Sequence, residues 1–180
     1  MIQVIGLSGF AGSGKTTAAK HLVEAHGFVT VKFAGPLKGM MRALGLGERE
    51  IEGDRKEVGH HFFAGKSPRY AMQTLGTEWG RSHFGEDFWV NLARERVLEI
   101  LEAGGHVVID DVRFPNEAAV IKELGGAVIR IYRPGVGPVN AHASDNQALA
   151  WDYEITNDDS ISVLHTALDA IVWQLERRCA

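Results

Sequence analysis

Residues 9–16 read Gly9-Phe-Ala-Gly12-Ser13-Gly14-Lys15-Thr16, which matches the pattern G-x-x-x-x-G-K-[ST]. The stretch lies between an apolar run at residues 2–6 and a segment of helical spacing at residues 15–26. Glycines let such a loop curl so that successive backbone N–H groups point at phosphate oxygens, and the helix adds its positive end. A chance match in a chain of this length is on the order of one in a hundred. The stretch therefore predicts a loop that binds a nucleoside triphosphate.

Two side chains of this loop suit phosphate chemistry. Lys15 can reach the β and γ phosphates, and the hydroxyl of Thr16 can ligate Mg²⁺. Neither the N-K-x-D base-reading pattern nor a D-x-x-G loop occurs in the chain, which argues against a switch GTPase. The predicted residues of the loop that bind the triphosphate are Ala11, Gly12, Ser13, Gly14, Lys15, Thr16 and Thr17.

Composition limits the classes of protein that fit. With 45% hydrophobic and 23% charged residues, the 180-residue chain can close the core of one globular domain. A net charge of -4 argues against a general nucleic-acid coat. No window reaches the roughly 18 apolar residues of a membrane helix, and no signal peptide opens the chain, so we expect a cytoplasmic protein without a membrane partner. The single cysteine, Cys179, excludes a disulfide framework and a cysteine zinc site.

Strand and helix patterns alternate along the chain, which predicts a parallel sheet with helices on both faces. The predicted fold class is α/β, specifically the P-loop NTPase fold with a five-stranded parallel sheet, in one domain over residues 1–180. Two insertions, at residues 34–88 and 134–150, have the size of an acceptor-binding segment and a lid. Within the first, residues 48–66 are charged and poorly periodic, which predicts a mobile excursion. Strands are expected at 2–6, 28–33, 106–110, 127–132 and 153–156, and helices at 15–26, 36–44, 68–83, 87–103, 115–124 and 160–178.

Acidic and basic residues follow the third predicted strand in Asp110-Asp111-Val-Arg113-Phe-Pro115-Asn-Glu117. Open α/β sheets bind ligands at the carboxyl ends of their strands, so a carboxylate there can hold Mg²⁺ and Arg113 can fork onto a phosphate. The alternative is that one aspartate caps the next helix while Arg113 pairs with Glu117 on the surface. Asp110 continues the strand and is preferred as the metal ligand alongside Thr16, and the choice between Asp110 and Asp111 stays open.

The helix predicted from Pro68 carries one polar stripe, with Gly76 and Gly80 beside it. Each glycine costs nearly 1 kcal/mol against alanine in a helix, so the pair suggests that something approaches closely. The ends of the stripe lie twelve residues apart, about 18 Å along an α-helix, and so cannot meet at one phosphate. Trp79 and Trp89 fit a core better than a base-stacking platform. The stripe consists of Arg69, Gln73, Thr77 and Arg81.

Arg133 and Lys66 lie at the edges of the two insertions, where a closing lid could bring positive charge to a transferring phosphoryl group. Arg133 precedes the hinge-like pair Pro134-Gly135, although a solvated charge at a strand end explains it equally well. We expect Lys15, Arg113 and Arg133 to be the catalytic cations. The histidines His60, His61 and His142 show no metal-ligand spacing and are interpreted as loop residues.

Together with the loop at 9–16, four stretches resemble phage-type deoxynucleoside monophosphate kinases over nearly the whole chain. They are Phe33-Ala34-Gly35-Pro36-Leu37-Lys38, Arg69-Tyr-Ala-Met-Gln73-Thr-Leu-Gly-Thr77-Glu-Trp-Gly-Arg81, Asp110-Asp111-Val-Arg113-Phe-Pro-Asn-Glu117 and Ile155-Thr-Asn157-Asp. The second and third are far more specific than the loop. The resemblance implies that the chain transfers the γ-phosphate of ATP, with Mg²⁺, to a deoxynucleoside 5′-monophosphate.

The same resemblance implies roles for individual residues. Arg113 is similar to the arginine that binds the acceptor phosphate, Arg133 to a lid arginine over ATP, and Asn157 to a residue bordering the adenine. One departure is His142-Ala-Ser144-Asp145, where the family is expected to read His-x-Ser-Glu. The implied substrate-binding residues are Phe33, Lys38, Arg69, Gln73, Trp79, Arg81, Asp111 and Arg113.

Two other functions remain open from the sequence. A small-metabolite kinase, such as a dephospho-coenzyme A kinase, shares the expected architecture, and a non-catalytic nucleotide sensor would need only the loop. The amide of Gln73 and the hydroxyl of Thr77 suit a nucleobase and a sugar better than a long pantetheine arm. The preferred base, the choice between deoxyribose and ribose, and a possible homodimer are not determined by the sequence.

Overall fold

The computed structural model describes residues 3–137 and 149–178, and the chain divides into two compact units. Unit 1 consists of Met1–Lys32 and Arg94–Ala180, and unit 2 of Phe33–Ala93. The chain therefore leaves unit 1 after Lys32 and returns to it inside a helix, between Ala93 and Arg94. Unit 2 covers nearly the same residues as the insertion expected at 34–88.

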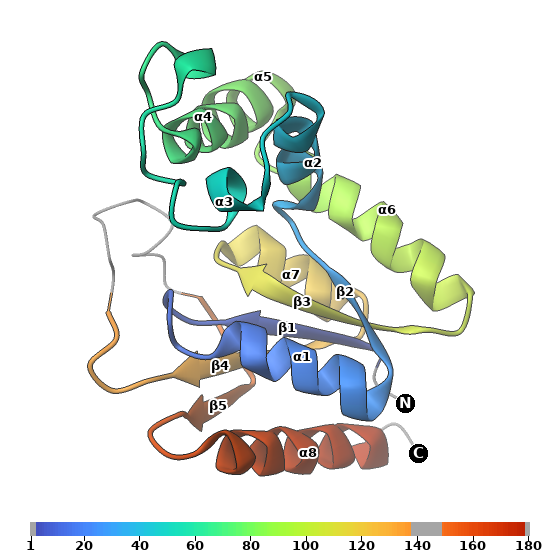
Figure 1. Ribbon diagram of the computed structural model, residues 1–180. Coiled ribbons are helices and arrows are strands. Elements are labelled where there is room, and N and C mark those ends of the chain that lie inside the picture. The colour runs from blue at the N-terminus through green and yellow to red at the C-terminus, as the bar shows by residue number, and fades with distance from the viewer. Residues whose placement is uncertain (1–2, 138–148, 179–180) are drawn as a thin grey trace. The chain divides into compact units, whose positions relative to one another are not determined.

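Unit 1 contains a five-stranded sheet in the order β2-β3-β1-β4-β5, and every neighbouring pair is parallel (Figure 1). This confirms the predicted sheet and fold class. Strands in such a sheet are apolar along their length because both faces are covered, and β1 is buried at every position. The strands are β1 (Val4–Ser8), β2 (Phe28–Val31), β3 (His106–Val112), β4 (Ala127–Tyr132) and β5 (Tyr153–Thr156).

Helices cover both faces of this sheet. On one face, α1 (Lys15–His26) and α8 (Ile161–Arg178) bury Leu22 and Leu168 against Ile5 and Ile129 (Figure 1). The opposite face carries α7 (Pro115–Glu123). Gly6 follows Ile5 in β1 and so faces the other side of the sheet, where a Cβ on Gly6 would lie 2.5 Å from Cδ1 of Ile121 in α7. Apolar side chains thus pack against both faces of the sheet.

The face formed by α1 and α8 also carries a polar contact. Nε2 of His21 and Nε2 of His26, both on α1, each lie 2.7 Å from Oδ1 of Asp169 on α8. Burial raises the pKa of Asp169, but the hydrogen bonds from His26 and His21 together lower it more, so this pKa lies below its ordinary value. Asp169 therefore links the two helices as a carboxylate at neutral pH.

Three strand boundaries differ from those expected at 2–6, 28–33 and 106–110. β1 continues beyond Gly6, because Leu7 and Ser8 pair with Ile129 and Arg130 of β4, and residues 1–2 lie outside the described part of the chain. β2 ends two residues earlier than expected, where the chain leaves for unit 2. β3 extends to Val112, so Asp111 lies within the strand, as Asp110 was expected to, instead of following it.

Unit 2 is helical and has its own apolar cluster of Leu37, Met41, Leu46, Ile51, Met72 and Trp89. The segment 48–66, expected to be a mobile excursion, contains two short helical elements, and its turn is closed by a 2.9 Å hydrogen bond from His60 N to Lys66 O. Elements of three or four residues are too short to give a periodic pattern. The helices are α2 (Gly35–Ala43), α3 (Glu48–Ile51), η1 (His61–Phe63), α4 (Pro68–Thr74), η2 (Leu75–Arg81), α5 (Ser82–Phe84) and α6 (Phe88–Glu102), the last of which crosses into unit 1.

No helix within residues 3–137 and 149–178 combines the length and the apolar character that spanning a membrane would take.

The predicted helix at 68–83 is not an unbroken α-helix. After α4 the chain widens into a seven-residue π-helix, η2, before α5. Trp89 explains this change, because its Nε1 donates a 2.8 Å hydrogen bond to the carbonyl of Gly76 and its indole packs against Gly80. A Cβ on Gly80 would lie only 2.5 Å from Nε1 of Trp89. The glycine at position 80 thus accommodates the protein's own tryptophan, and the group that approaches closely there is the indole of Trp89.

We expect Gly80→Ala to lower the free energy of unfolding by about 1–3 kcal/mol, because the new methyl group forces the buried indole of Trp89 to move. The matched control is Gly39→Ala in α2, where nothing lies within 4 Å of the Cβ position and alanine favours the helix by up to about 1 kcal/mol. Urea unfolding of both variants measures the difference. Equal effects of the two substitutions would contradict the packing role of Gly80.

Candidate functional site

The carboxyl ends of all five strands in unit 1 meet at one edge of the sheet, because all neighbouring strands are parallel. This edge brings together most of the residues that the sequence predicted for phosphate binding, and it adds others. We call it the strand-end site. It contains the loop 9–14 after β1, Lys32 after β2, Asp110 and Asp111 at the end of β3, Arg113 just beyond β3, Arg133 after β4 and Asn157 after β5.

The loop after β1 ends in a helix terminus without a side-chain cap. Gly14 occupies the N-cap position with φ of 111°, a conformation that favours glycine, and no side chain accepts a hydrogen bond there. The first turn of α1 also contains no acidic residue. The N–H groups at the start of a helix have no partner within the helix, so this terminus can receive an anion.

Asn157 holds this loop in place. Its Nδ2 donates a 2.8 Å hydrogen bond to the carbonyl of Ser13, and its own backbone N–H donates to Tyr132 O at 2.7 Å. A Cβ on Gly14 would lie 2.5 Å from the same amide nitrogen. Sequence reasoning assigned Asn157 to ATP only through the family resemblance and missed this contact, since the partners lie 144 residues apart.

Lys15 and three hydroxyl groups complete the loop. The ammonium group of Lys15 donates to the carbonyls of Gly9 at 2.7 Å and Phe10 at 2.8 Å. Thr16 is exposed in the first turn of α1. The hydroxyls of Ser8 and Ser13 are buried and have no hydrogen-bond partner among the described residues. Buried hydroxyls of this kind are costly unless something binds them, which fits a polar ligand at the loop.

A β-bulge places the two aspartates. Gly6 of β1 pairs with Ile109 and Ser8 pairs with Val112, so Leu7 alone lies opposite both Asp110 and Asp111. Bulges redirect side chains and are common beside active sites. In a regular strand, two successive carboxylates would point to opposite faces of the sheet. Because of the bulge, this rule cannot be used to assign Asp110 and Asp111 to different faces.

Lys32 is a member of the site that sequence reasoning missed. Its Nζ lies 2.9 Å from Oδ2 of Asp110, whose side chain is only 5% exposed. The other oxygen, Oδ1, is buried and has no hydrogen-bond partner in the described structure. A lysine near the end of an apolar strand was a signal for such a pair, but its partner lies in a different strand 78 residues away.

Glu117 determines the position of Arg113. The Glu117 carboxylate is 3% exposed and accepts hydrogen bonds from the backbone N–H groups of Arg113 at 2.7 Å and Phe114 at 3.0 Å. The alternative of a surface ion pair between Arg113 and Glu117 is therefore wrong, because Glu117 is buried and binds the backbone. The guanidinium group of Arg113 lies at the exposed start of the turn into α7.

Arg133 is exposed where β4 ends, and its carbonyl accepts a 3.1 Å hydrogen bond from Val136 N. Gly135 within this turn has φ of 77°. The expected lid at 134–150 is described only at its two ends. The departure from the family pattern at His142, Ser144 and Asp145 lies outside the described residues.

The remaining predicted substrate-binding residues lie in unit 2. Three of the cations have acidic neighbours: Lys38 pairs with Glu52 at 2.6 Å, Arg69 with Glu57, and Arg81 with Glu86 at 3.5 Å. Phe33 is buried, Gln73 is half-buried, and Trp79 is 37% exposed within a cluster of aromatic rings formed with Phe84, Phe88 and Trp89.

Comparison with known proteins gives a consistent family. A family model described as deoxynucleotide monophosphate kinase matches residues 64–168. A protein of Acanthamoeba polyphaga mimivirus described as a deoxynucleotide monophosphate kinase is 34% identical over 184 residues, covering 94% of this chain and 95% of its own. The deoxynucleoside-5′-monophosphate kinase of Escherichia phage T5 is 33% identical over 79 residues, covering 43% of this chain and 30% of its own.

Solved structures show the same fold. APS kinase of Mycobacterium tuberculosis, solved in complex with AMPPNP and APS, aligns with a TM-score of 0.55 and 11% identity over 95% of this chain and 97% of its own. At that identity the likeness concerns the fold alone.

We expect Lys32→Met to lower the free energy of unfolding by about 1–3 kcal/mol, because it leaves the buried Asp110 carboxylate without its cation. Adding Asp110→Asn should recover part of that loss, and the double-mutant cycle in urea measures the coupling. The control is Arg96→Met, which removes an exposed pair with Glu99 and should change stability by less than about 1 kcal/mol. Strict additivity of the Lys32 and Asp110 substitutions would contradict the pairing.

Proposed function

The chain belongs to the deoxynucleotide monophosphate kinase family, and from that premise we propose that it transfers the γ-phosphate of ATP to a deoxynucleoside 5′-monophosphate. Membership makes it a nucleotide-binding phosphotransferase. The proposed products are ADP and the deoxynucleoside diphosphate. One observation carries the proposal: the uncapped amino end of α1 opens at the strand ends directly beside the ammonium group of Lys15.

Lys15 would change partners when ATP binds. Its ammonium group is bound to the neutral carbonyls of Gly9 and Phe10, and a phosphate oxygen offers a stronger, charge-assisted hydrogen bond. Asn157 would keep the backbone of the loop in place during that exchange, since it holds the carbonyl of Ser13. Residues 11–17 would thus bind the phosphates, and Arg133 would cover them from the end of β4.

The proposed chemistry is in-line phosphoryl transfer. An oxygen of the acceptor phosphate forms a bond to the γ-phosphorus while the bond from that phosphorus to the β–γ bridging oxygen breaks, and its electron pair leaves with ADP. No general base is needed, because the acceptor phosphate is already an anion near neutral pH. The protein would supply position and positive charge through Lys15, Arg113 and Arg133.

The residues of the strand-end site fit Mg²⁺. Hard oxygen ligands suit this ion. The exposed hydroxyl of Thr16 provides one, and so does the buried Oδ1 of Asp110, which has no hydrogen-bond partner in the described part of the chain. We prefer Asp110 to Asp111 as its carboxylate. When bound, the ion would neutralise charge on the β and γ phosphates. Lys32 would hold the Asp110 carboxylate in its orientation through the 2.9 Å contact.

The acceptor is proposed to bind through residues of the insertion 34–88 together with Asp111 and Arg113, while residues 134–150 act as a lid. The amide of Gln73 can donate and accept hydrogen bonds at once, which suits the edge of a base. Arg69 and Arg81 have carboxylate partners in unit 2, so each would bind substrate as part of an ion pair. The proposed acceptor residues of unit 2 are Phe33, Lys38, Arg69, Gln73, Trp79 and Arg81.

An assay of ADP release over deoxynucleoside monophosphates, ribonucleoside monophosphates and dephospho-coenzyme A tests the function. We expect turnover with at least one deoxynucleotide and none with dephospho-coenzyme A. Lys15→Ala should abolish turnover while the chain still unfolds cooperatively, because its ammonium group lies in a loop. Turnover of dephospho-coenzyme A alone, or ATP binding without acceptor-dependent ADP release, would overturn the proposal.

We expect Arg113→Ala to raise the KM for the acceptor and to lower kcat, with a smaller effect on ATP affinity. Loss of such a charge-assisted contact should cost about 2–4 kcal/mol of transition-state stabilisation. Steady-state kinetics with each substrate varied in turn measures the effects on the two KM values and on kcat. Arg96→Ala, at an exposed position of α6, serves as the control. A large loss of ATP affinity with an unchanged KM for the acceptor would show that Arg113 binds ATP and not the acceptor.

A further inference from the structure

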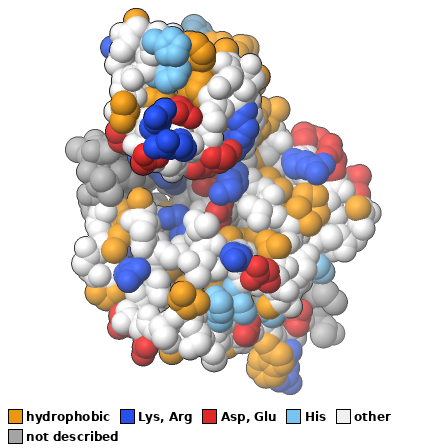
Figure 2. All heavy atoms as spheres, in the orientation of Figure 1, with side chains coloured by type: hydrophobic (Ala, Val, Ile, Leu, Met, Phe, Trp, Pro, Cys, Tyr) orange, Lys and Arg blue, Asp and Glu red, His pale blue; other side chains and the backbone are white. Residues whose placement is uncertain are grey.

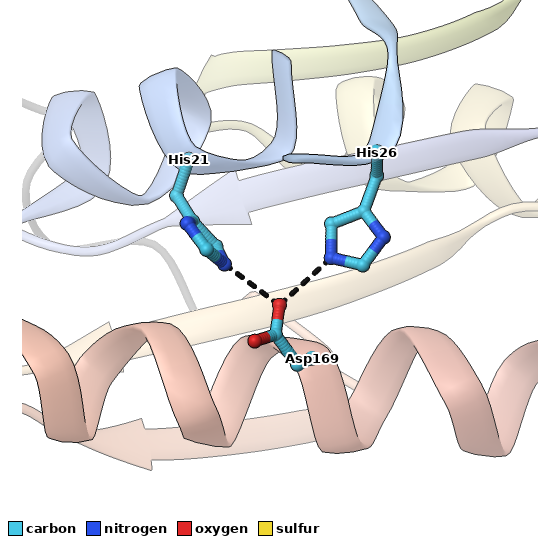
Figure 3. A group of neighbouring side chains, drawn as sticks. All are labelled: His21, His26 and Asp169. Carbon is cyan, nitrogen blue, oxygen red and sulfur yellow. Dashed lines mark hydrogen bonds and ion pairs between the residues drawn. The ribbon is translucent and has the colours of Figure 1, made fainter. Parts of the chain in front are cut away.

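A second group of chemically active side chains lies away from the strand-end site, on the surface formed by α1 and α8. Histidine side chains gather there in the lower half of Figure 2. Figure 3 shows His21 and His26 pointing from α1 toward Asp169 on α8. We call these three residues the helix-pair cluster. The proposed kinase chemistry uses none of them.

The geometry of this cluster is convergent. Both Nε2 atoms lie 2.7 Å from the same oxygen, Oδ1 of Asp169, and the ligand atoms of all three residues lie within 4.8 Å of one another. His21 and His26 are five residues apart on α1, whereas residues on the same face of a regular α-helix are three or four apart. His26 is the last residue of α1, where Gly27 ends the helix in a left-handed conformation.

A fourth residue fixes one of the histidines. The imidazole of His165, one turn before Asp169 on α8, stacks on His21 with ring centroids 3.9 Å apart and an interplanar angle of 11°. Nε2 of His165 is buried and has no hydrogen-bond partner among the described residues. This stacking limits rotation of His21 and leaves its Nε2 directed at Asp169.

Location and exposure favour a cation here. The cluster lies toward the carboxyl end of α1, where the helix dipole is negative, whereas the phosphate-binding loop lies at the amino end, on the order of 16 Å away along the helix. The side chain of Asp169 is 49% exposed, which gives an ion a path from solvent and leaves room for a water ligand. The two ends of α1 thus have opposite electrostatic preferences.

We propose that His21, His26 and Asp169 form a binding site for a divalent transition-metal ion, with Zn²⁺ as the best match. Imidazole nitrogen and carboxylate oxygen are the donors that Zn²⁺ prefers besides thiolate, at about 2.0–2.2 Å. Two ligands of a tetrahedral ion at those lengths lie about 3.3 Å apart, so a small rotation of the half-exposed Asp169 side chain opens the present 2.7 Å spacing. Water completes the fourth position.

Titration calorimetry of the purified chain with ZnCl₂, without nucleotide or magnesium, tests the site. We expect about one Zn²⁺ per chain and an increase in Tm on binding. His26→Gln and Asp169→Asn should each weaken binding by at least about tenfold, since even residues outside the ligand set cost that much in metal sites. His83→Gln, which removes an exposed histidine of unit 2, should leave binding unchanged.

A second readout does not depend on variants that fold well. Co²⁺ added to the wild-type chain should give the visible absorption bands of a four-coordinate nitrogen and oxygen site, and Zn²⁺ should displace them. Binding that survives His26→Gln but is lost in Asp110→Asn would assign the ion to the strand-end site and overturn the proposal. Absence of Zn²⁺ and Co²⁺ binding to the wild-type chain would also overturn it and leave the cluster as a hydrogen-bonded link between α1 and α8.

Discussion

Parallel pairing of the five strands directs all their carboxyl ends to one edge of the sheet, and the chemistry of unit 1 depends on this constraint. Each connection between parallel strands must return across a face of the sheet, so helices cover both faces and the strands become apolar. The charged residues of the strand-end site lie at the carboxyl ends of these strands or just beyond them. The phosphate-binding loop, the carboxylates of β3 and the arginines after β3 and β4 are neighbours for that reason.

Buried charge at this edge is balanced locally. Asp110 lies almost fully out of water and would be costly there without the ammonium group of Lys32. The bulge in β3 brings a second carboxylate to the same part of the sheet, and Glu117 holds the following turn through backbone N–H groups. Lys32 and Glu117 thus shape the site without taking part in the proposed reaction, and Oδ1 of Asp110 has no hydrogen-bond partner within residues 3–137 and 149–178.

Packing explains part of the most specific motif in unit 2. The run from Gln73 to Arg81 is similar to that of a kinase family, yet Gly80 within it lies against the indole of Trp89, and the carbonyl of Gly76 accepts the hydrogen bond of that indole. The π-helix satisfies a buried tryptophan N–H. A motif that identifies a family thus combines residues that shape the protein with residues that could contact a substrate.

The sequence by itself determined the parallel α/β fold and the family, and it predicted a phosphate-binding loop, because these depend on periodicity and on motifs of neighbouring residues. It also placed Arg113 and Arg133 after strands. Only the tertiary structure revealed the contacts of Lys32 with Asp110, Asn157 with Ser13, and the histidines of α1 with Asp169. Each of these contacts joins residues from distant parts of the chain. Such contacts depend on strand order and on the packing of helices, for which a single sequence carries no local signal.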